Sequence, residues 1–446
     1  MKVLLEPRQG PDVAVCKGRI CFTLVHRTHR AIDGGGFARA RVRGANRQRK
    51  GNPLPAGMIF EGRPTWAEVK LGQLLHNLRA IRRHVNPPGT RPRRMILAVV
   101  KGNAYGHGTV PIAKALEKAG TEWLGVASPA EGAELRESGI RAHILVMTGF
   151  WTGEENGLLE HKLTAAVSGL EQLRWLERAA ARAQNRRGPI GFHLKVDSGM
   201  NRLGVTPEQV PEFVRALANS PHLRLEGVFT HFASSDAFLT KQTEEQEARF
   251  DAALKCLRSQ GVAPGIVHLA NSAAIGARPE TWADMVRPGA LLYGYHQFYD
   301  VPEKKAEVEA ALPLRPALSL RTRIVTLRDV PIGGAVGYNA RWTATRPSRV
   351  AVIAAGYADG LSRSLTNRGR VMIRGQFAPL VGTISMDLAA ADVTEIEGAR
   401  MGDVVTIYGA DGDAVQWASD VARVLGTVSS DLLCSIGQRV PRLYIR

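Results

Sequence analysis

The 446-residue sequence predicts an α/β fold in which a (β/α)8 TIM-like barrel is followed by a mainly-β C-terminal domain. Eight short apolar runs alternate with amphipathic segments over roughly 200 residues, whereas an open doubly wound sheet commonly has about five or six strands. After about residue 311 the pattern changes to short alternating strands with Gly and Pro turns. Because one hydrophobic core rarely serves so long a chain, we divide it into 1–57, 58–311 and 312–446.

The barrel range begins with a strand-like alternation over 63–70, and apolar residues at helical spacing between 71 and 81 predict a helix after it. Further helix starts are indicated at Ser128, where Ser-Pro-Ala-Glu forms a capping box, and at Thr206, which also precedes a proline. Another helix is expected from about Thr109. The eight barrel strands are expected at 95–100, 123–126, 144–147, 163–167, 190–196, 223–229, 266–269 and 284–287.

The second domain is expected to be built from short strands, with helical periodicity only in 414–425. Residues 302–316, which carry a Lys/Glu run between prolines, are interpreted as the connection between the domains. The strands of this domain are expected at 317–326, 349–353, 370–373, 379–382 and 403–408.

The composition indicates a globular protein, because 44% of the residues are hydrophobic and 22% are charged. No apolar run approaches the roughly 20 residues that a membrane span requires. The four cysteines, Cys16, Cys21, Cys256 and Cys434, lack metal-ligand spacing and fit a reducing compartment. We therefore expect a cytoplasmic protein with no membrane span, no disulfide framework and no metal site.

The net charge of +18 is concentrated near the start of the chain. Residues 1–57 hold 12 Lys/Arg and 3 Asp/Glu, which is half of the net charge in about an eighth of the length. This segment shows no helical or strand periodicity and no secretory signal. It can be a disordered basic tail, a nucleic-acid-binding arm, or an upstream stretch that is not translated. We favour the third interpretation, with Met58 as the start, because recognisable structure begins directly after it.

Polar residues follow the strands at the end of the barrel where active sites lie. Lys101 follows the first strand, and Gly102, Gly106 and Gly108 after it allow a sharp turn. Such a lysine, when partly desolvated, can form a Schiff base with an aldehyde cofactor. Singly, each polar residue has an ordinary explanation, such as a solvated lysine or a core histidine, but packing does not explain so many on one rim. The others are Lys195 and Arg202 after strand five, His231 after six, Asn271 and Ser272 after seven, and Arg287 at the end of eight.

The segment Val99-Val100-Lys101-Gly102-Asn103-Ala104-Tyr105-Gly106-His107-Gly108 resembles the cofactor-lysine segment of alanine racemases, and the resemblance extends from about residue 60 to 446. It implies that Lys101 holds pyridoxal 5'-phosphate as an aldimine and acts as one catalytic base. Tyr357, in Ala355-Gly356-Tyr357-Ala358-Asp359-Gly360, matches the second base. The remaining cofactor contacts implied are Arg287 at the pyridine nitrogen, Tyr105, Ser272, Gly289 and Ala290 at the phosphate, and the neighbouring His231 and Asn271.

The resemblance also implies substrate contacts and an oligomer. Arg202 matches an arginine that contacts the cofactor's phenolic oxygen and the substrate carboxylate, and Lys195 matches a lysine found as a carbamate that positions this arginine. Met386 matches a residue whose backbone meets the substrate carboxylate. On resemblance alone, we expect a head-to-tail homodimer in which Tyr357 and Met386 enter the neighbouring subunit's site.

Three positions depart from the family pattern. Ser430 stands where a phosphate-contacting tyrosine is common, so cofactor affinity is expected to be lower. Gly102 stands where alanine is usual, and Asn201 at a position that varies; neither is expected to alter the chemistry.

The implied function is interconversion of L- and D-alanine by a two-base mechanism, which supplies D-alanine for peptidoglycan. Arg287 stays cationic and cannot accept the proton of the pyridine nitrogen, so the ring would be a weak electron sink that suppresses side reactions. An amino-acid decarboxylase of the same fold would typically place a carboxylate there. A non-catalytic pyridoxal-phosphate-binding homeostasis protein would lack the domain that bears Tyr357. A racemase that also accepts serine stays open, whereas a nucleic-acid-binding protein would need a reading motif that the sequence lacks.

Overall fold

The computed structural model describes residues 63–183 and 188–445, which belong to one compact unit that extends from Phe60 to Arg446. The basic segment 1–57, with its three interpretations, lies outside the described residues.

Eight parallel strands form the first sheet, in the order β8-β7-β6-β5-β4-β3-β2-β9. β9 pairs with β2, and the gap between β8 and β9 is bridged by hydrogen bonds from Asp284 N to Val267 O (3.0 Å) and from Arg287 N to Ala270 O (3.0 Å). The sheet is therefore a nearly closed barrel, and the predicted fold class is confirmed. The strands are β2 (Met95–Val99), β3 (Trp123–Val126), β4 (His143–Val146), β5 (Thr164–Val167), β6 (Ile190–Lys195), β7 (Leu223–Phe229), β8 (Ile266–His268) and β9 (Met285–Val286).

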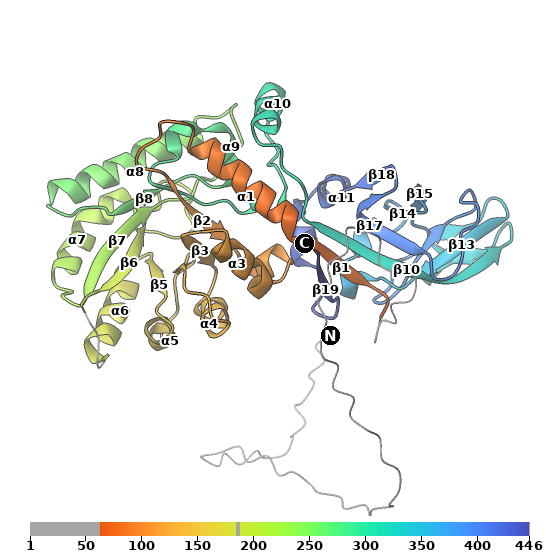
Figure 1. The fold of residues 1–446 in the computed structure, drawn as a ribbon, viewed down its shortest axis with the longest axis horizontal. Coiled ribbons are helices and arrows are strands. Elements are labelled where there is room, and N and C mark those ends of the chain that lie inside the picture. The colour runs from red at the N-terminus through yellow and green to blue at the C-terminus, as the bar shows by residue number, and fades with distance from the viewer. Residues whose placement is uncertain (1–62, 184–187, 446) are drawn as a thin grey trace, which may run out of the picture. The chain divides into compact units, whose positions relative to one another are not determined.

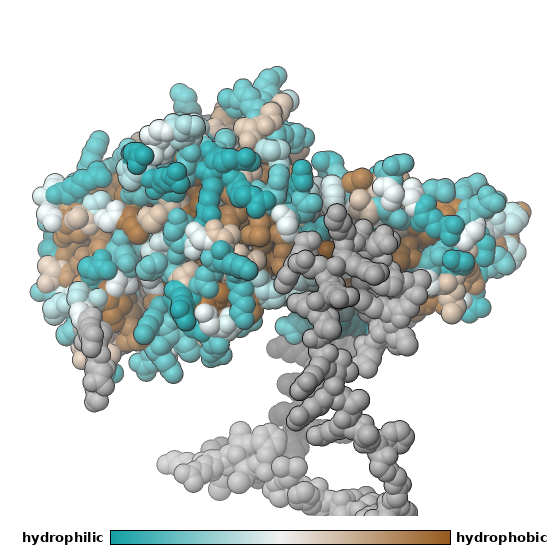
Figure 2. Space-filling view, viewed as in Figure 1, coloured by the Kyte–Doolittle hydropathy of each residue, from teal (hydrophilic) through white to brown (hydrophobic). Residues whose placement is uncertain are grey.

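Helices surround the strands of the barrel (Figure 1). Their apolar faces are buried; α1, for example, buries Leu74, Leu78 and Ile81. Figure 2 shows hydrophilic side chains over most of these helices on the face drawn, as expected for amphipathic helices. The helices are α1 (Leu71–Val85), α3 (Thr109–Lys118), α4 (Pro129–Glu137), α5 (Glu155–Glu160), α6 (Leu170–Arg182), α7 (Val210–Ala218), α8 (Gln242–Ser259) and α9 (Ser272–Ala277).

Both predicted helix starts are present. Ser128 Oγ accepts a hydrogen bond from Glu131 N at 3.3 Å at the start of α4. Thr206 precedes the 3-10 turn η1 (Pro207–Gln209), which leads into α7.

A small apolar cluster, most of whose members lie on the barrel strands, is part of the packed interior of the barrel. Its buried members are Leu97, Val99, Trp123, Leu145, Met147, Ala166, Phe229 and Met285.

The second sheet has nine strands and includes one from the beginning of the described chain. β1 (Trp66–Lys70) pairs antiparallel with β10 (Leu318–Val330) and parallel with β19 (Arg442–Ile445). The sequence range 58–311 places these residues with the barrel, but the structure places them in the other sheet. The other strands are β13 (Ser348–Ile353), β14 (Arg370–Ile373), β15 (Gln376–Pro379), β16 (Ala389–Asp392), β17 (Val404–Asp411) and β18 (Ala414–Gln416).

Three expectations for this region differ from the structure. The expected helix 414–425 is divided into β18 and α11 (Ala418–Leu425), because a turn at Gly412, with φ +58°, folds 414–416 back onto β17. The strand expected at 379–382 ends at Pro379, because it pairs with β14 over 376–379. The connection 302–316 contains α10 (Pro302–Ala311).

Several short elements had no sequence signal that we recognised. They are the sheet strands β16 and β19, the ribbon strands β11 (Ala335–Val336) and β12 (Trp342–Thr343), helix α12 (Ser429–Cys434), and the 3-10 turns η2 (Pro279–Thr281), η3 (Ala290–Tyr293), η4 (Tyr338–Ala340), η5 (Tyr357–Asp359) and η6 (Arg363–Leu365).

Candidate active site

Lys101 opens a left-handed turn directly after β2, which is labelled α2 (Lys101–Tyr105). Gly102, Asn103, Ala104 and Tyr105 have φ values of +63°, +54°, +51° and +52°. A left-handed backbone costs about 1–2 kcal/mol at each residue other than glycine. Strain of this kind persists only where surrounding structure holds it, and it is common at functional sites. The glycines that the sequence indicated are therefore part of a longer strained turn.

Residues distant in the sequence hold this turn. Glu131 Oε1, at the start of α4, accepts a hydrogen bond from Gly102 N at 2.8 Å. From β19, Arg442 Nε donates to Gly106 O at 3.0 Å, and Tyr444 Oη donates to His107 O at 3.0 Å. Sequence reasoning identified Glu131 only as a capping residue and did not identify Arg442 or Tyr444.

A cavity of about 820 Å³ lies beside Lys101 at the carboxyl ends of the barrel strands. Its walls come from the barrel, from α11, from the segment that joins α11 to α12, and from the first turn of α12, which contributes Ser430. The lining includes eight residues that the sequence assigned to a cofactor site: Lys101, Tyr105, His231, Asn271, Ser272, Arg287, Gly289 and Ala290.

The two lysines of the site are surrounded by positive charge. Burial lowers the pKa of Lys101, and the nearby charge of Arg202 lowers it further. Burial also lowers the pKa of Lys195 to about 8, with smaller contributions from Arg202, Arg287 and Lys101. Both amines therefore lose their protons more readily than an exposed lysine, which is what a nucleophilic or proton-accepting amine requires.

Arg287 is a buried cation held by backbone carbonyls. Its side chain is 2% exposed, and it donates to His268 O at 2.9 Å and to Thr230 O and Leu269 O at 2.8 Å each. Burial lowers the pKa of Arg287 to about 9, so the guanidinium stays charged at neutral pH. Among the described residues, its Nε has no hydrogen-bond partner. An unpaired donor in a buried cation is costly, and an acceptor in the cavity would satisfy it.

Three neutral histidines are linked to Arg287: His231 at the cavity, and His268 and His193 on the barrel strands β8 and β6. Burial, followed by the charge of Arg287, lowers the pKa of His231, and burial likewise lowers that of His268 and His193. The Nδ1 atoms of His231 and His268 each lie 3.3 Å from Arg287, so both accept its hydrogen bonds. His268 Nε2 then lies 2.9 Å from His193 Nδ1. The sequence reasoning missed His268 and His193, because it examined residues after strands rather than inside them.

Ser272, Gly289 and Tyr105 form a group of polar atoms in the cavity wall, which we call the cradle. Gly289 N donates to Ser272 Oγ at 2.9 Å, and a Cβ at residue 289 would lie 2.5 Å from Tyr105 Oη. Burial raises the pKa of Tyr105 to about 12, so its phenol is a neutral donor. Asn271 caps α9, since its Oδ1 accepts from Ala274 N at 3.1 Å. Backbone N–H groups and hydroxyls arranged in this way suit a phosphate group.

Arg202 lies on a loop that Asp197 organises. The Asp197 carboxylate accepts hydrogen bonds from the backbone N–H groups of Gly199, Asn201 and Arg202, each at 3.0 Å. Lys195 is buried at the end of β6, with its Nζ 5.6 Å from the centre of the Phe229 ring. Neither Arg202 nor Lys195 lines the cavity, but both lie close enough to affect the pKa of its residues.

Tyr357 and Met386 lie together in the second domain. Tyr357 N donates to Ser385 O, and Ala358 N donates to Met386 O, each at 3.1 Å. Their side chains are exposed, at 43% and 51%. Within the described chain, Tyr357 and Met386 lie next to each other, but neither lines the cavity that contains Lys101.

Two other kinds of site were sought in the part of the chain that the structure describes. The described residues include no cluster of three or more His, Cys, Asp or Glu side chains suited to a metal ion. Within the same residues, every helix is too short or too polar to cross a lipid bilayer.

The chain is similar to alanine racemases along most of its length. The family description "Alanine racemase, N-terminal domain" matches residues 69–297, and "Alanine racemase, C-terminal domain" matches 317–444. Alanine racemase of Geobacter sulfurreducens is 42% identical over 391 residues, which cover 86% of this chain and 98% of the relative. Alanine racemase of Sorangium cellulosum is 40% identical over 387 residues, which cover 86% and 99%.

Solved structures agree with these sequence relatives. The alanine racemase of Bacillus anthracis with bound L-Ala-P has a TM-score of 0.78 and 34% identity, and the match covers 86% of this chain and 96% of that one. The alanine racemase of Streptomyces lavendulae, which produces D-cycloserine, has a TM-score of 0.78 and 34% identity, with 86% and 98% covered. The chain therefore belongs to the alanine racemase family, whose members are pyridoxal-phosphate-dependent isomerases.

Proposed function

We propose that this chain interconverts L- and D-alanine and holds pyridoxal 5'-phosphate in the cavity beside Lys101. The observation that carries the proposal is the pairing of an amine of lowered pKa, Lys101, with a buried arginine, Arg287, on one cavity wall. A buried arginine without a carboxylate at the cofactor's nitrogen suits a racemase better than a decarboxylase.

The residues present fit the cofactor. The unpaired Nε of Arg287 is a donor for the pyridine nitrogen, and Tyr105, Ser272, Gly289 and Ala290 supply the phosphate contacts. His231 and Asn271 complete the lining. When bound, the cofactor withdraws electrons from the substrate's Cα, which makes its proton removable. Arg287, which stays cationic, limits this withdrawal and so favours brief deprotonation over side reactions.

Two bases act on opposite faces of the substrate in this proposal. The Nζ of Lys101 takes or returns the Cα proton on one face, and the Oη of Tyr357 does so on the other. A phenol accepts a proton only as its anion, so the role of Tyr357 requires a cation in the site that it enters, such as Arg287, to stabilise that anion. Arg202 and the backbone of Met386 bind the substrate carboxylate. Burial lowers the pKa of Lys195 to about 8, so its neutral amine can add to the carbon of CO2 and release one proton to water; the carbamate anion that results positions Arg202.

The second base comes from a neighbouring subunit. Tyr357 and Met386 are exposed and lie outside the cavity of their own chain, so we propose a head-to-tail homodimer in which each cavity is completed by the partner. We further propose that the enzyme works in the cytoplasm and supplies D-alanine for peptidoglycan.

The roles of Lys101 and Tyr357 can be tested with two variants loaded with cofactor. Lys101→Ala is expected to lose racemisation and the visible absorbance of bound cofactor, whereas Lys114→Ala, on the exposed face of α3, keeps both. Tyr357→Phe is expected to slow exchange of the Cα proton with solvent deuterium from one enantiomer only. Equal slowing from L- and D-alanine would contradict the two-base assignment, and racemisation by Lys101→Ala would assign the cofactor to another lysine.

Mixing the two variants tests the shared sites. Each variant homodimer lacks a base in both sites, but a mixed dimer has one site with both Lys101 and Tyr357 intact. Random exchange of subunits should therefore restore about a quarter of wild-type activity, because half of the dimers are mixed and each has one intact site. No recovery after verified subunit exchange would place both bases of a site on one chain. Running the same assay with L-serine decides whether the activity is restricted to alanine.

A further inference from the structure

Asp359 is a buried carboxylate two residues after Tyr357 that sequence reasoning left without a role. It is 1% exposed, and its two oxygens accept hydrogen bonds from four donors. One donor is Gly356 N, at 2.9 Å from Oδ2, which closes the turn that presents Tyr357. The others come from two arginines at opposite ends of the described chain.

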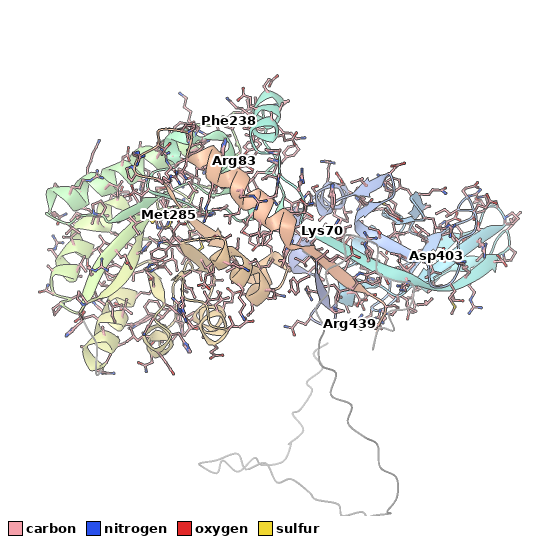
Figure 3. All side chains as sticks on the ribbon, in the orientation of Figure 1. Lys70, Arg83, Phe238, Met285, Asp403 and Arg439 are labelled. Atoms are coloured by element: carbon pink, nitrogen blue, oxygen red, sulfur yellow. The ribbon has the colours of Figure 1, made fainter. Side chains whose placement is uncertain are left out.

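The first arginine, Arg439, lies between α12 and β19 and is labelled in Figure 3. Its Nε donates to Asp359 Oδ1 at 2.8 Å and its Nη2 to Oδ2 at 3.1 Å, so the pair is bidentate. The same Nη2 lies 2.8 Å from Asp387 Oδ1 and donates to Met386 O at 3.3 Å. Arg439 thus connects the turn of Tyr357 with the segment of Met386.

The second arginine, Arg63, precedes β1 and makes the same connection from the other side. Its Nη2 donates to Asp359 Oδ2 at 3.0 Å, to Asp387 O at 2.6 Å and to Ala354 O at 2.8 Å. Asp359 is the one carboxylate that both arginines share at hydrogen-bond distance among the described residues. Without it, the two cations would keep only the half-exposed carboxylate of Asp387, which lies 2.8 Å from Arg439 and 3.9 Å from Arg63, and backbone carbonyls.

The backbone leaves these two segments little freedom. A Cβ at Gly356 would lie 2.3 Å from Met386 O and 2.4 Å from Ser385 O, so the chains touch directly at this position. Close backbone contact fixes their separation, and the arginines bound to Asp359 fix their orientation. Bidentate arginine–carboxylate pairs are suited to this, because they specify geometry as well as attraction.

We propose that Asp359 is the positioning residue of the second base: through Arg63 and Arg439 it holds Tyr357 and Met386 in one fixed arrangement before they enter the neighbouring site. It does not touch the substrate, and the inference rests on the proposed role of Tyr357. A displacement of about 1 Å in a reacting group can cost on the order of 100-fold in rate. Asp359→Asn keeps the size of the side chain but replaces one acceptor with a donor, so we expect a fall of about 10–100-fold in racemisation.

The direction of exchange distinguishes positioning from general loss of structure. L- and D-alanine are equally stable, so kcat/KM falls equally for both, but exchange of the Cα proton with deuterium reports each base separately. Asp359→Asn is expected to slow exchange at least tenfold more from one enantiomer, and that enantiomer is the one that Tyr357→Phe affects. Asp359→Glu, which keeps the charge, should recover part of the rate.

A matched control removes a different part-buried ion pair of the same domain. Glu68 lies 3.1 Å from Arg321 Nε, between β1 and β10, and its side chain is 12% exposed. Glu68→Gln should lower the thermal midpoint of the cofactor-free protein without changing the ratio of the two exchange rates. If Asp359→Asn does not fold, Asp387→Asn replaces it, since this side chain is 48% exposed. It should show a smaller preference for the same enantiomer.

The outcomes separate the two proposals. Equal slowing of both enantiomers by Asp359→Asn, or by Asp387→Asn in its place, while Tyr357→Phe stays selective, would overturn the positioning role and leave the two bases in place. Equal slowing by Tyr357→Phe itself would overturn both. If Tyr357→Phe and Asp359→Asn slow exchange selectively from the same enantiomer, and Glu68→Gln does not, the inference is supported.

Discussion

Replacing Gly106 with alanine tests the strained turn that carries Lys101. Gly106 has φ +77°, and an added Cβ would lie 1.9 Å from Leu433 O and 2.8 Å from Leu433 C. Both contacts are with backbone, so a flexible side chain cannot relieve them. The turn and the end of α12, where Leu433 lies, must therefore move apart, and a shift of the turn also breaks the hydrogen bond from Arg442 Nε to Gly106 O.

The expected cost has three parts. A left-handed alanine costs about 1–2 kcal/mol, overpacking costs about 1–3 kcal/mol, and a lost hydrogen bond from a charged donor costs about 1.5–3 kcal/mol. These parts overlap, since one displacement relieves the clash and breaks the bond, so we expect a loss of about 3–5 kcal/mol in the free energy of unfolding.

Gly102→Ala is the matched control within the same turn. Gly102 has φ +63°, but the nearest atom to an added Cβ is Cys434 Sγ at 3.5 Å, an ordinary contact. The added Cβ therefore costs only the free energy of a left-handed alanine backbone, about 1–2 kcal/mol. The unfolded chain with alanine has less conformational entropy than the chain with glycine, which offsets about 0.4–1 kcal/mol of this cost. Urea unfolding of the two cofactor-free variants, followed by tryptophan fluorescence, compares them directly. Equal destabilisation would refute the reasoning that Leu433, rather than backbone conformation, makes glycine necessary at 106.

Three further predictions concern the cavity. Gly289→Ala should weaken cofactor binding about 10–100-fold while the protein stays folded, because its Cβ would lie 2.5 Å from Tyr105 Oη; equilibrium dialysis measures this, and an unchanged dissociation constant contradicts the phosphate cradle. Ser430→Tyr should tighten cofactor binding in the same assay by adding a phenol to the cavity wall; no change would show that Ser430 costs no affinity. Lys195→Met should stabilise the cofactor-free protein in CO2-free buffer at pH 7, where a buried charge is removed. Because the pKa of Lys195 is about 8 when folded and ordinarily 10.5, the unfolded chain binds more protons between these values, and the stabilisation should shrink as the pH rises through that window; an equal gain at pH 7 and pH 10 would contradict the lowered pKa.

Local patterns predicted the barrel well because buried parallel strands are continuous apolar runs. All eight runs became strands, with ends that shifted by at most one residue. β1 shows the limit of such patterns. Its alternation predicts a strand, but its partners β10 and β19 lie far along the chain, and nothing local specifies which sheet it joins. β18 was missed for a related reason, since three residues next to a helix share its apolar periodicity.

Some residues of the candidate site could be predicted from local sequence patterns, and others could not. Residues at strand ends could be found from sequence, because barrel geometry gathers them on one rim, and Lys101, His231 and Arg287 do line one cavity. Residues that act through hydrogen bonds to distant backbone could not be found. Glu131 and Arg442 hold the turn after Lys101, and His268 accepts from Arg287 inside the barrel. Their roles depend on tertiary contacts that no spacing encodes.

The position of β1 between β10 and β19 has a consequence for biosynthesis. On the ribosome, β1 is made before the barrel, but its two neighbours in the sheet are made long afterwards (Figure 1). The barrel strands can pair as they emerge, whereas Arg442 and Tyr444 reach the turn after Lys101 only when translation is nearly finished. A nascent chain released early would therefore contain a barrel whose cofactor lysine lacks its support, so competence for catalysis arrives with the last strand.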